Sequence, residues 1–320
     1  MSGGTLVLTH SHMKDLLSMP EVIPAVEQAF AHYARGEAQM PAKVYVSVEK
    51  GDFRAMPAAV PGAACVKWVN VHPGNPAVGL PTVMAIIIYS DAATGYPLAV
   101  MDGTEVTAFR TGAVAAVASK YLARKRPATL GLVGAGRQAR TQLQAHLELF
   151  GFESIRVYDH AEAAVDRFMA AFPGRPVHRA SLEETCASDI VCTVTPATAP
   201  VVKRGWIRPG THINAMGADA PGKEELEPSL LRAASVVVDD IRQASEAGEI
   251  NVPISTGLYT KGEVYGTLGE IVAGIKPGRT DDSAITIFDS TGLAIQDLAA
   301  AQVVYGKAKA RGGYLTVKFD

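Results

Sequence analysis

The chain has 320 residues, of which 48% are apolar and 19% are charged, and its formal net charge at pH 7 is −2. This length allows one large domain or two medium domains. The near-neutral charge gives no sign of the basic surface that binds nucleic acid or an anionic membrane. The longest apolar run, residues 83–89, is far too short to span a bilayer.

Three features indicate a reducing cytoplasm and no metal centre. Residues 1–12 lack a basic segment followed by an apolar stretch, so no signal peptide is predicted. The cysteines, Cys65, Cys186 and Cys192, have no metal-ligand spacing, and we expect reduced thiols. His10 and His12 form the only close histidine pair and have no further ligand nearby. We therefore expect no metal and no histidine base.

The first region is predicted to form a helix, several strands and a second helix. Ser18 and Glu21 have the spacing of a capping box, and Ile23, Val26 and Phe30 follow on one helical face. Strands are expected at residues 43–48, where three valines share one side, around Lys67, and at residues 83–89 and 97–101. A helix at residues 107–124 closes the region.

The second region alternates short strands with helices, which is typical of a doubly wound parallel α/β sheet. Ser181 and Glu184 again have the spacing of a capping box. Residues 314–319 are predicted to form a strand that returns to the first region. The strands of the second region are expected at residues 129–133, 155–159, 190–195, 212–216, 236–240 and 285–289.

A glycine-rich turn follows the first strand of the second region and predicts a dinucleotide site. Gly134 allows a tight turn, Gly136 lets the backbone approach a pyrophosphate, and Ala139 permits close packing of helix on strand. The helix that begins near Arg137 and Gln138 offers free N–H groups to phosphates. A purely structural glycine turn is the alternative.

The acid at the end of the next strand predicts NAD as the cofactor. Asp159 lies 23 residues beyond Gly136, where a carboxylate accepts hydrogen bonds from the ribose hydroxyls and repels a 2′-phosphate. His160 follows, at a position where an NADP enzyme more often has arginine. We therefore expect NAD and not NADP.

Over nearly its whole length the chain resembles the ornithine cyclodeaminase/mu-crystallin family, and within it the archaeal-type alanine dehydrogenases. The motifs that carry the resemblance are Gln39-Met40-Pro41, Arg54-Ala55-Met56-Pro57, Lys67-Trp68-Val69-Asn70, Gly79-Leu80-Pro81-Thr82, Phe109-Arg110-Thr111-Gly112, Asn214-Ala215-Met216-Gly217-Ala218-Asp219 and Asp289-Ser290-Thr291-Gly292-Leu293-Ala294-Ile295-Gln296-Asp297.

The resemblance implies a homodimer and two domains. Residues 1–123 and 297–320 are expected to form an α+β domain for substrate binding and dimerisation, and residues 124–296 a Rossmann domain that binds NAD. The implied reaction is the NAD-dependent oxidation of a small amino acid at its Cα–N bond, or in reverse the reductive amination of its 2-oxoacid.

Three cations are candidates for holding the substrate carboxylate. The resemblance gives this role to Lys43, Lys67 and Arg110. Arg110 lies in the first turn of its predicted helix, where a cation opposes the helix dipole unless an anion is nearby. Lys67 stands in an apolar strand, and burial there would lower its pKa. The alternatives are a surface ion pair for Arg110, an amine that reaches water for Lys67, and a solvated face for Lys43.

Asp219 follows the strand at residues 212–216, at the edge of a parallel sheet where ligands bind, and matches the family's catalytic aspartate. In that role, alongside Lys67, it would exchange a proton with the amine or water. The alternative is a loop aspartate that caps a helix at residues 221–223. Thr195, Met216 and Thr111 are assigned to the cofactor's surroundings. A substrate or cofactor role, or simple helix capping, is open for the turn Ser290, Thr291 and Gly292.

Arg54 favours a small neutral substrate side chain. A cation near the distal ammonium of ornithine or lysine is repelled by a few kcal/mol at about 4 Å. We therefore expect alanine dehydrogenase chemistry, with ornithine cyclodeaminase and cyclic ketimine (pyrroline-2-carboxylate) reductase as alternatives. A non-catalytic crystallin-like binding protein is a further alternative, from another functional class.

Overall fold

A computed structural model describes residues 4–319, and the chain packs as two units. One unit contains the residues up to Arg110 together with those from Leu293 onward, and the other contains Thr111–Gly292. Helix α3 (Gly103–Leu122) begins in the first unit and continues into the second. The predicted domain joins, after residues 123 and 296, lie farther along the chain than these divisions, and the outermost residues of the predicted domains, 1–3 and 320, lie outside the described residues.

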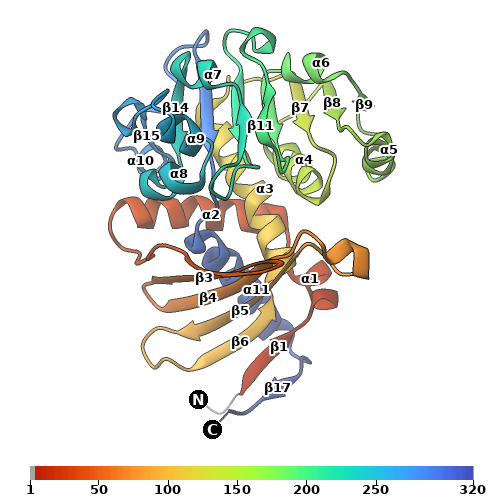
Figure 1. Ribbon diagram of the computed structural model, residues 1–320. Coiled ribbons are helices and arrows are strands. Elements are labelled where there is room, and N and C mark those ends of the chain that lie inside the picture. The colour runs from red at the N-terminus through yellow and green to blue at the C-terminus, as the bar shows by residue number, and fades with distance from the viewer. Residues whose placement is uncertain (1–3, 320) are drawn as a thin grey trace. The chain divides into compact units, whose positions relative to one another are not determined.

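The first unit is built on a seven-stranded sheet with the strand order β17-β1-β6-β5-β4-β3-β2. Strands β2 to β6 are antiparallel, because each follows the one before it through a short turn or loop. β17 pairs antiparallel with β1, as the red and blue strands of Figure 1 show, so the predicted return of the tail is confirmed. The bounds are β1 (Thr5–Leu8), β2 (Val44–Val48), β3 (Gly51–Val60), β4 (Ala63–Val71), β5 (Val83–Asp91), β6 (Pro97–Asp102) and β17 (Thr316–Val317).

Helices cover one face of this sheet. α11 (Ala294–Arg311) packs against β3, β4, β5 and helix α2 (Met19–Ala34), and α1 (His10–Leu16) lies against α11 (Figure 1). The predicted buried face of α2, with Ile23, Val26 and Phe30, is confirmed. α2 begins directly after Ser18, but the Ser18 hydroxyl makes no capping hydrogen bond, so that part of the predicted capping box is not formed. A short 3-10 helix, η1 (Asn75–Val78), lies between β4 and β5.

The two faces of the sheet differ in exposure, because successive side chains of a strand point to opposite sides. Met56, Lys67, Ile87 and Met101 lie opposite one another across four strands and are all buried. On the other face, Trp68 and Ile86 are paired across β4 and β5 and are 46% and 53% exposed. We call this second face the open sheet face. Its exposed apolar side chains are Val44, Val46, Val48, Trp68, Ile86 and Ile88.

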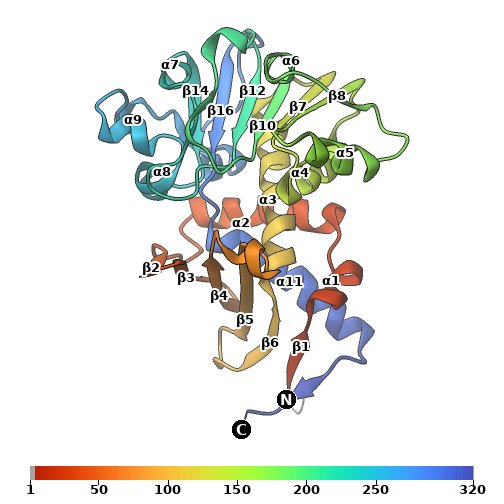
Figure 2. The same ribbon diagram turned by 45° about the vertical axis from the view of Figure 1, so that its right-hand side comes forward.

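The second unit contains an eight-stranded parallel sheet with the order β15-β14-β16-β12-β10-β7-β8-β9, whose central strands stand side by side in Figure 2. The predicted parallel α/β class is confirmed, and the six predicted strands are present within two residues of their expected bounds. The bounds are β7 (Thr129–Val133), β8 (Ser154–Tyr158), β9 (Val177–Arg179), β10 (Ile190–Thr193), β12 (His212–Ala215), β14 (Ala234–Val238), β15 (Gly266–Thr267) and β16 (Ile285–Asp289).

Helices and a small second sheet complete this unit. β11 (Thr198–Val202) and β13 (Glu224–Leu226) form a two-stranded parallel sheet that the sequence did not predict. The capping box of Ser181 and Glu184 is confirmed by reciprocal hydrogen bonds. The helices are α4 (Arg137–Leu149), α5 (Glu162–Ala170), α6 (Leu182–Cys186), α7 (Pro228–Arg232), α8 (Ile241–Ala247), α9 (Asn251–Ser255) and α10 (Leu268–Val272), with short 3-10 helices η2 (Arg204–Trp206) and η3 (Lys261–Glu263).

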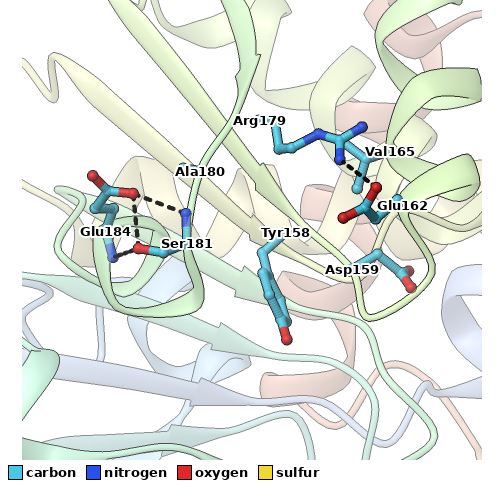
Figure 3. Close-up of a pocket in the computed structure, with 8 residues that line it drawn as sticks. All are labelled: Tyr158, Asp159, Glu162, Val165, Arg179, Ala180, Ser181 and Glu184. Atoms are coloured by element: carbon cyan, nitrogen blue, oxygen red, sulfur yellow. Dashed lines mark hydrogen bonds and ion pairs between the residues drawn. The ribbon is translucent and has the colours of Figure 1, made fainter.

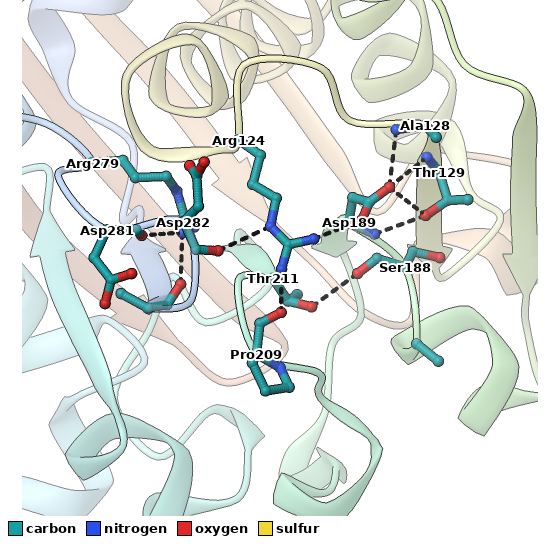
Figure 4. Close-up of polar contacts among 12 residues, drawn as sticks. Arg124, Ala128, Thr129, Ser188, Asp189, Pro209, Thr211, Arg279, Asp281 and Asp282 are labelled. Atoms are coloured by element: carbon teal, nitrogen blue, oxygen red, sulfur yellow. Dashed lines mark hydrogen bonds and ion pairs between the residues drawn. The ribbon is translucent and has the colours of Figure 1, made fainter.

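Polar contacts tie together the amino ends of the parallel strands (Figure 4). Asp189, just before β10, accepts hydrogen bonds from the backbone of Ala128 and Thr129 at the start of β7. Arg124 donates to the carbonyl oxygens of Pro209 and Asp282, which precede β12 and β16. These backbone hydrogen-bonding groups at the amino edge of the sheet therefore have partners within the protein. None of the helices that the structure describes is long and apolar enough to cross a membrane.

Close packing of two helices in the second unit predicts an effect of a glycine substitution. A Cβ at Gly112 in α3 would lie 2.3 Å from the carbonyl oxygen of Thr141 in α4. We expect Gly112→Ala to lower the free energy of unfolding by about 1–3 kcal/mol, because backbone must shift to make room. Gly306→Ala in α11 is the control, since a Cβ there meets open space and helix propensity favours alanine. Urea unfolding of both variants checks this, and equal stability of the two would contradict it.

Candidate functional site

The glycine turn has the geometry predicted for it. Gly134 directly follows β7 and has a φ of +104°, a conformation that residues with a Cβ rarely adopt. Gly136 precedes the first residue of α4, and none of the described side chains makes a capping hydrogen bond at the start of that helix. A Cβ at Gly136 would meet open space. The turn therefore leaves backbone donors and the positive end of a helix dipole available to an anion.

Asp159 lies beside this turn at the end of β8. Its Oδ2 accepts a hydrogen bond of 2.8 Å from the N–H of Ala135, and its Oδ1 accepts one from Ala161. His160 is almost fully exposed and places its Nδ1 3.2 Å from Asp159 Oδ1. The strand end and the glycine turn are thus joined by one carboxylate, whose position the spacing of 23 residues had indicated.

A cavity of about 490 Å³ runs along the turn and brings several predicted residues together. Gly134, Gly136, Asp159, His160 and Thr195 all line it. A second cavity of about 390 Å³ shares Tyr158 and Asp159 with the first (Figure 3). In it, Arg179 forms an ion pair with Glu162, and the Ser181 hydroxyl donates a hydrogen bond to Glu184. These charged side chains therefore already have partners within the protein. Sequence reasoning did not indicate this second cavity.

Five other residues predicted around the cofactor do not line the 490 Å³ cavity, as far as the described residues show it. Arg137 and Gln138 begin α4, and Ala139 is fully buried beneath them. The carbonyl of Thr111 accepts a hydrogen bond from Gln142, and the N–H of Met216 donates to Thr193. The packing role predicted for Ala139 fits its burial, while cofactor contacts of the other four stay predictions.

The structure brings two of the three cations predicted to hold the substrate carboxylate, Lys67 and Arg110, together around an acid. Lys67 is buried, and its Nζ lies 2.8 Å from Asp297 Oδ2 and 3.3 Å from the Thr107 hydroxyl. Arg110 places its Nε 3.1 Å from Asp297 Oδ1. Burial lowers the pKa of Lys67 to about 8, assisted by the charges of Arg110 and Lys43 and opposed by that of Asp297. The Lys67 amine does not reach water, so that alternative is wrong.

The helical position predicted for Arg110 is wrong. α3 begins at Gly103, not near residue 107, so Arg110 lies well beyond the first turn and does not oppose the free N–H groups of the helix. Asp102 supplies an acceptor at the true start, for the N–H of Glu105. Arg110 is nevertheless next to an anion, because Asp297 is buried beside it, and its ion pair is internal and not on the surface.

Arg54 lies on β3 and is 6% exposed. Its Nε and Nη2 donate to the two carboxylate oxygens of Asp52, at 2.7 and 3.3 Å, and its guanidinium lies 5.3 Å from the ring centre of Tyr45. Because the Asp52 carboxylate offsets the charge of Arg54, the repulsion of a distal ammonium is weaker than an isolated cation would give.

Asp219 lies in the loop between β12 and β13 and forms an ion pair with Lys223. Its side chain is 38% exposed. The turn that follows leads into a strand and not a helix, so the helix-cap alternative is wrong. Asn251 holds this turn by accepting from the N–H of Gly222 and donating to the carbonyl of Lys223. An acidic side chain therefore stands at the carboxyl edge of the sheet on a supported loop.

The turn at Ser290, Thr291 and Gly292 is held by the buried Asp239. The carboxylate of Asp239 accepts hydrogen bonds from the N–H groups of Thr291 and Gly292 and from the Ser290 and Thr291 hydroxyls. This arrangement resembles capping, the alternative left open for these residues. Direct contacts of this turn with a substrate or cofactor stay a prediction.

Sequence reasoning missed four buried polar residues that support these groups: Asp239, Glu225, Gln296 and Asp297. Asp297 and Gln296 belong to the last family motif, and an acid at the start of a helix is ordinarily explained by the dipole. Gln296 Oε1 accepts from Arg110, whereas its buried Nε2 has no hydrogen-bond partner among the described residues. In residues 4–319, no three histidine, cysteine or acidic side chains are grouped to hold a metal.

The chain is similar to known proteins over nearly its whole length. The model of the ornithine cyclodeaminase/mu-crystallin family matches residues 4–312. An alanine dehydrogenase from Archaeoglobus fulgidus is 50% identical over 317 residues, which cover 98% of each chain. The chain belongs to the ornithine cyclodeaminase/mu-crystallin family.

Two solved structures place this family member among proteins with nicotinamide cofactors. An archaeal alanine dehydrogenase dimer with bound NAD has a TM-score of 0.97 and 50% identity and covers 99% of both chains. The Δ1-pyrroline-2-carboxylate reductase of Thermococcus litoralis, in complex with NADH and L-proline, has a TM-score of 0.94 and 40% identity. It covers 98% of this chain and 100% of that chain.

Proposed function

We propose that this chain is an NAD-dependent oxidoreductase that converts L-alanine, NAD⁺ and water to pyruvate, ammonium, NADH and a proton, reversibly. The buried group of Lys67, Arg110 and Asp297, with Lys43 close enough to act on Lys67, carries the proposal of a carboxylate substrate. Cations enclosed in this way bind an anion far more strongly than exposed ones do. The 50% identity to an alanine dehydrogenase over nearly the whole chain supports alanine as that substrate.

The glycine turn fits NAD. Its backbone donors are uncapped, Gly136 leaves open space, and the cavity beside it is lined by Asp159. Gly134 and Gly136 would hold the pyrophosphate and Asp159 the adenosine ribose. When bound, the nicotinamide supplies the hydride acceptor for the oxidation of Cα.

The chain's own side chains would bind the substrate and move protons. Lys67 and Arg110 orient the α-carboxylate, with Lys43 adding positive charge. The substrate ammonium first releases a proton to solvent, and loss of hydride from Cα then leaves an iminium, which water attacks at the same carbon. Asp219 accepts one proton of that water and returns it to the nitrogen, so the carboxylate is unchanged after one turnover. As the C–N bond breaks, the hydroxyl proton leaves with ammonia as ammonium and the carbonyl of pyruvate forms.

The pyrroline-2-carboxylate reductase supports a second candidate substrate. That relative is 40% identical, and a cyclic imine carries no distal ammonium. Arg54 would therefore not repel it, whereas ornithine would meet the partly offset charge of Arg54. A reductase of this kind needs the same carboxylate grip but no attacking water.

An NADH absorbance assay separates these functions. Pyruvate with ammonium, pyrroline-2-carboxylate with NADH, and ornithine with NAD⁺ are tested in parallel on the same preparation. We expect the highest kcat/KM for pyruvate with ammonium. Turnover of ornithine alone contradicts the proposal, and no turnover of any of them supports a binding protein without catalysis.

Asp159 predicts the choice of cofactor. We expect kcat/KM to be higher with NADH than with NADPH, because the Asp159 carboxylate repels a 2′-phosphate. Asp159→Ser should reduce this preference by about tenfold or more. Asp166→Ser is the matched control, because Asp166 is exposed and pairs with Arg179 instead. A wild-type preference for NADPH would contradict the assignment.

We also propose that the chain forms a homodimer through the open sheet face. Six exposed apolar side chains gather there, more than a monomer surface ordinarily leaves in one place. The related archaeal alanine dehydrogenase is a dimer. Sedimentation should give twice the chain mass for the wild type and one chain mass for Trp68→Lys. A wild-type monomer at micromolar concentration would refute this assignment.

A cytoplasmic location is proposed from the cysteines, which are all buried and free of disulfides. Unpaired thiols suit a reducing compartment. Recovery of the protein in a periplasmic or secreted fraction would contradict this.

A further inference from the structure

Glu225 on β13 is a fully buried carboxylate with both oxygens occupied. Its Oε1 accepts hydrogen bonds of 2.7 Å from the N–H and the hydroxyl of Thr195. Its Oε2 accepts hydrogen bonds from the Thr193 hydroxyl at 2.6 Å and the Gly217 N–H at 2.8 Å. Four donors on one buried carboxylate compensate much of the cost of removing it from water.

These donors come from two loops that carry proposed site residues. Thr193 is the last residue of β10, Thr195 follows in the loop after it, and Thr195 lines the cavity at the glycine turn. Gly217 follows β12 and lies two residues before Asp219. The approach is close, because a Cβ at Gly217 would lie 2.1 Å from the Thr195 carbonyl oxygen and 2.6 Å from the Glu225 carboxylate. Glu225 thus fixes the distance between the two loops.

Glu225 is itself held by a row of buried acids. Glu249 accepts from the N–H groups of Glu225 and Leu226, and Asp289 accepts from those of Glu249 and Ile250. Each acid is bonded to the backbone of the next. Burial raises the pKa of Glu225 and Glu249, and raises that of Asp289 to about 8.

We propose that Glu225 is a positioning residue, which sets the place of Asp219 through Gly217 and that of the cofactor-side loop through Thr195. This inference rests on the proposed function of Asp219. Glu225 does not touch substrate or cofactor in this role. The row of acids behind it holds the backbone of β13 through the hydrogen bonds that Glu249 accepts from Glu225 and Leu226.

Glu225→Gln changes the contacts without changing the shape. An amide has one acceptor oxygen, and its NH₂ group must face one pair of the present donors. The Thr193 hydroxyl can rotate to accept, but a backbone N–H cannot. In either orientation the N–H of Thr195 or of Gly217 therefore loses its acceptor, and that loop moves.

The test measures kcat at saturating substrate and cofactor, together with amide hydrogen exchange. We expect Glu225→Gln to lower kcat by about 10²-fold, as a displacement near 1 Å at a reacting group does. Exchange should quicken in the peptide with Thr195 or the one with Gly217. Glu224→Gln is the matched control, because the buried Oε1 of the neighbouring Glu224 has no hydrogen-bond partner within residues 4–319, and this change should leave both readouts unchanged. A purely structural role would lower the melting temperature but not kcat of the folded protein.

A milder variant keeps the inference testable if Glu225→Gln does not fold. Thr193→Val removes one donor to Oε2 and preserves the side-chain shape, and we expect kcat to fall by about tenfold. Unchanged kcat in Glu225→Gln, or in Thr193→Val when the former is unfolded, would overturn the inference while wild-type turnover upholds the proposed function. If the wild type turns over no substrate, the proposed function fails, and unchanged exchange at Thr195 and Gly217 then overturns the positioning role.

Discussion

Asp219→Asn is expected to lower kcat by about 10²–10⁴-fold, the contribution typical of a positioned general base. An amide has nearly the size of the carboxylate but cannot accept a proton from the attacking water. NADH affinity should change little, because the glycine turn and Asp159, and not Asp219, line the cavity proposed for the dinucleotide. Steady-state kinetics with pyruvate and ammonium, combined with titration of NADH fluorescence, measures both quantities on one preparation.

Lys223→Gln is the control for this prediction. It removes the ion-pair partner of Asp219 and leaves the carboxylate in place. We expect a loss of kcat no greater than about tenfold, because an exposed ion pair contributes little. Near-normal kcat in Asp219→Asn would remove Asp219 from the mechanism, and equal losses in both variants would point to loop geometry in place of proton transfer.

Asp297→Asn is expected to shift the alkaline limit of kcat/KM to lower pH by about 1–3 pH units. Lys67 binds the carboxylate as a cation, and its pKa is about 8. The groups that act on it are Asp297, the cations Arg110 and Lys43, the Thr107 hydroxyl and the neighbouring thiol Cys65. Asp297 is the one that raises the pKa by charge, so its loss leaves the protonated amine disfavoured by burial and by two cations. Activity should therefore fall as the pH rises, and earlier than in the wild type.

Asp15→Asn is the control, since it removes one negative charge from an exposed ion pair with Arg311. Titration of ammonium affects all three proteins equally and cancels from the comparison. Removing one partner of a buried pair costs about 3–5 kcal/mol of stability, so rates are compared where every variant is folded. An unchanged alkaline limit in Asp297→Asn would show that Lys67 does not set it.

The second unit was the easier part of the fold to predict. Six of the eight strands in its parallel sheet contain apolar stretches that end near a turn or an acid such as Asp159, and their bounds were found within two residues, whereas the short edge strands β9 and β15 were not predicted. The first unit was harder, because β3 contains Pro57 and has Arg54 at one of its buried positions, so its hydropathy does not show the alternation that its burial does. The start of α3 was also missed: Gly103 and Thr104 are poor helix formers, and the acceptor for the N–H of Glu105 comes from Asp102 on the preceding strand.

The candidate site divides in a similar way. Residues that belong to a local motif, such as Gly134 and Asp159, were found because the spacing itself is dictated by the turn. Residues that act through distant partners were not. Asp297 is 187 positions from Arg110, and Glu225 meets Thr195 across 30 positions. No local pattern records which buried acid a lysine or a loop amide meets, because only the completed fold brings them together.

The return of the tail to the first strand has a consequence for synthesis on the ribosome. The second unit is continuous in sequence and can fold as soon as it emerges from the ribosome, since domains generally fold as units during synthesis. The first sheet cannot, because its α11 and β17 are made last. Until then Lys67 and Arg110 lack the carboxylate of Asp297. In a nascent or truncated chain that ends before Leu293, Lys67 and Arg110 therefore lack their counter-charge and the first unit is incompletely folded. Such a chain is expected to be an early substrate for chaperones or proteases.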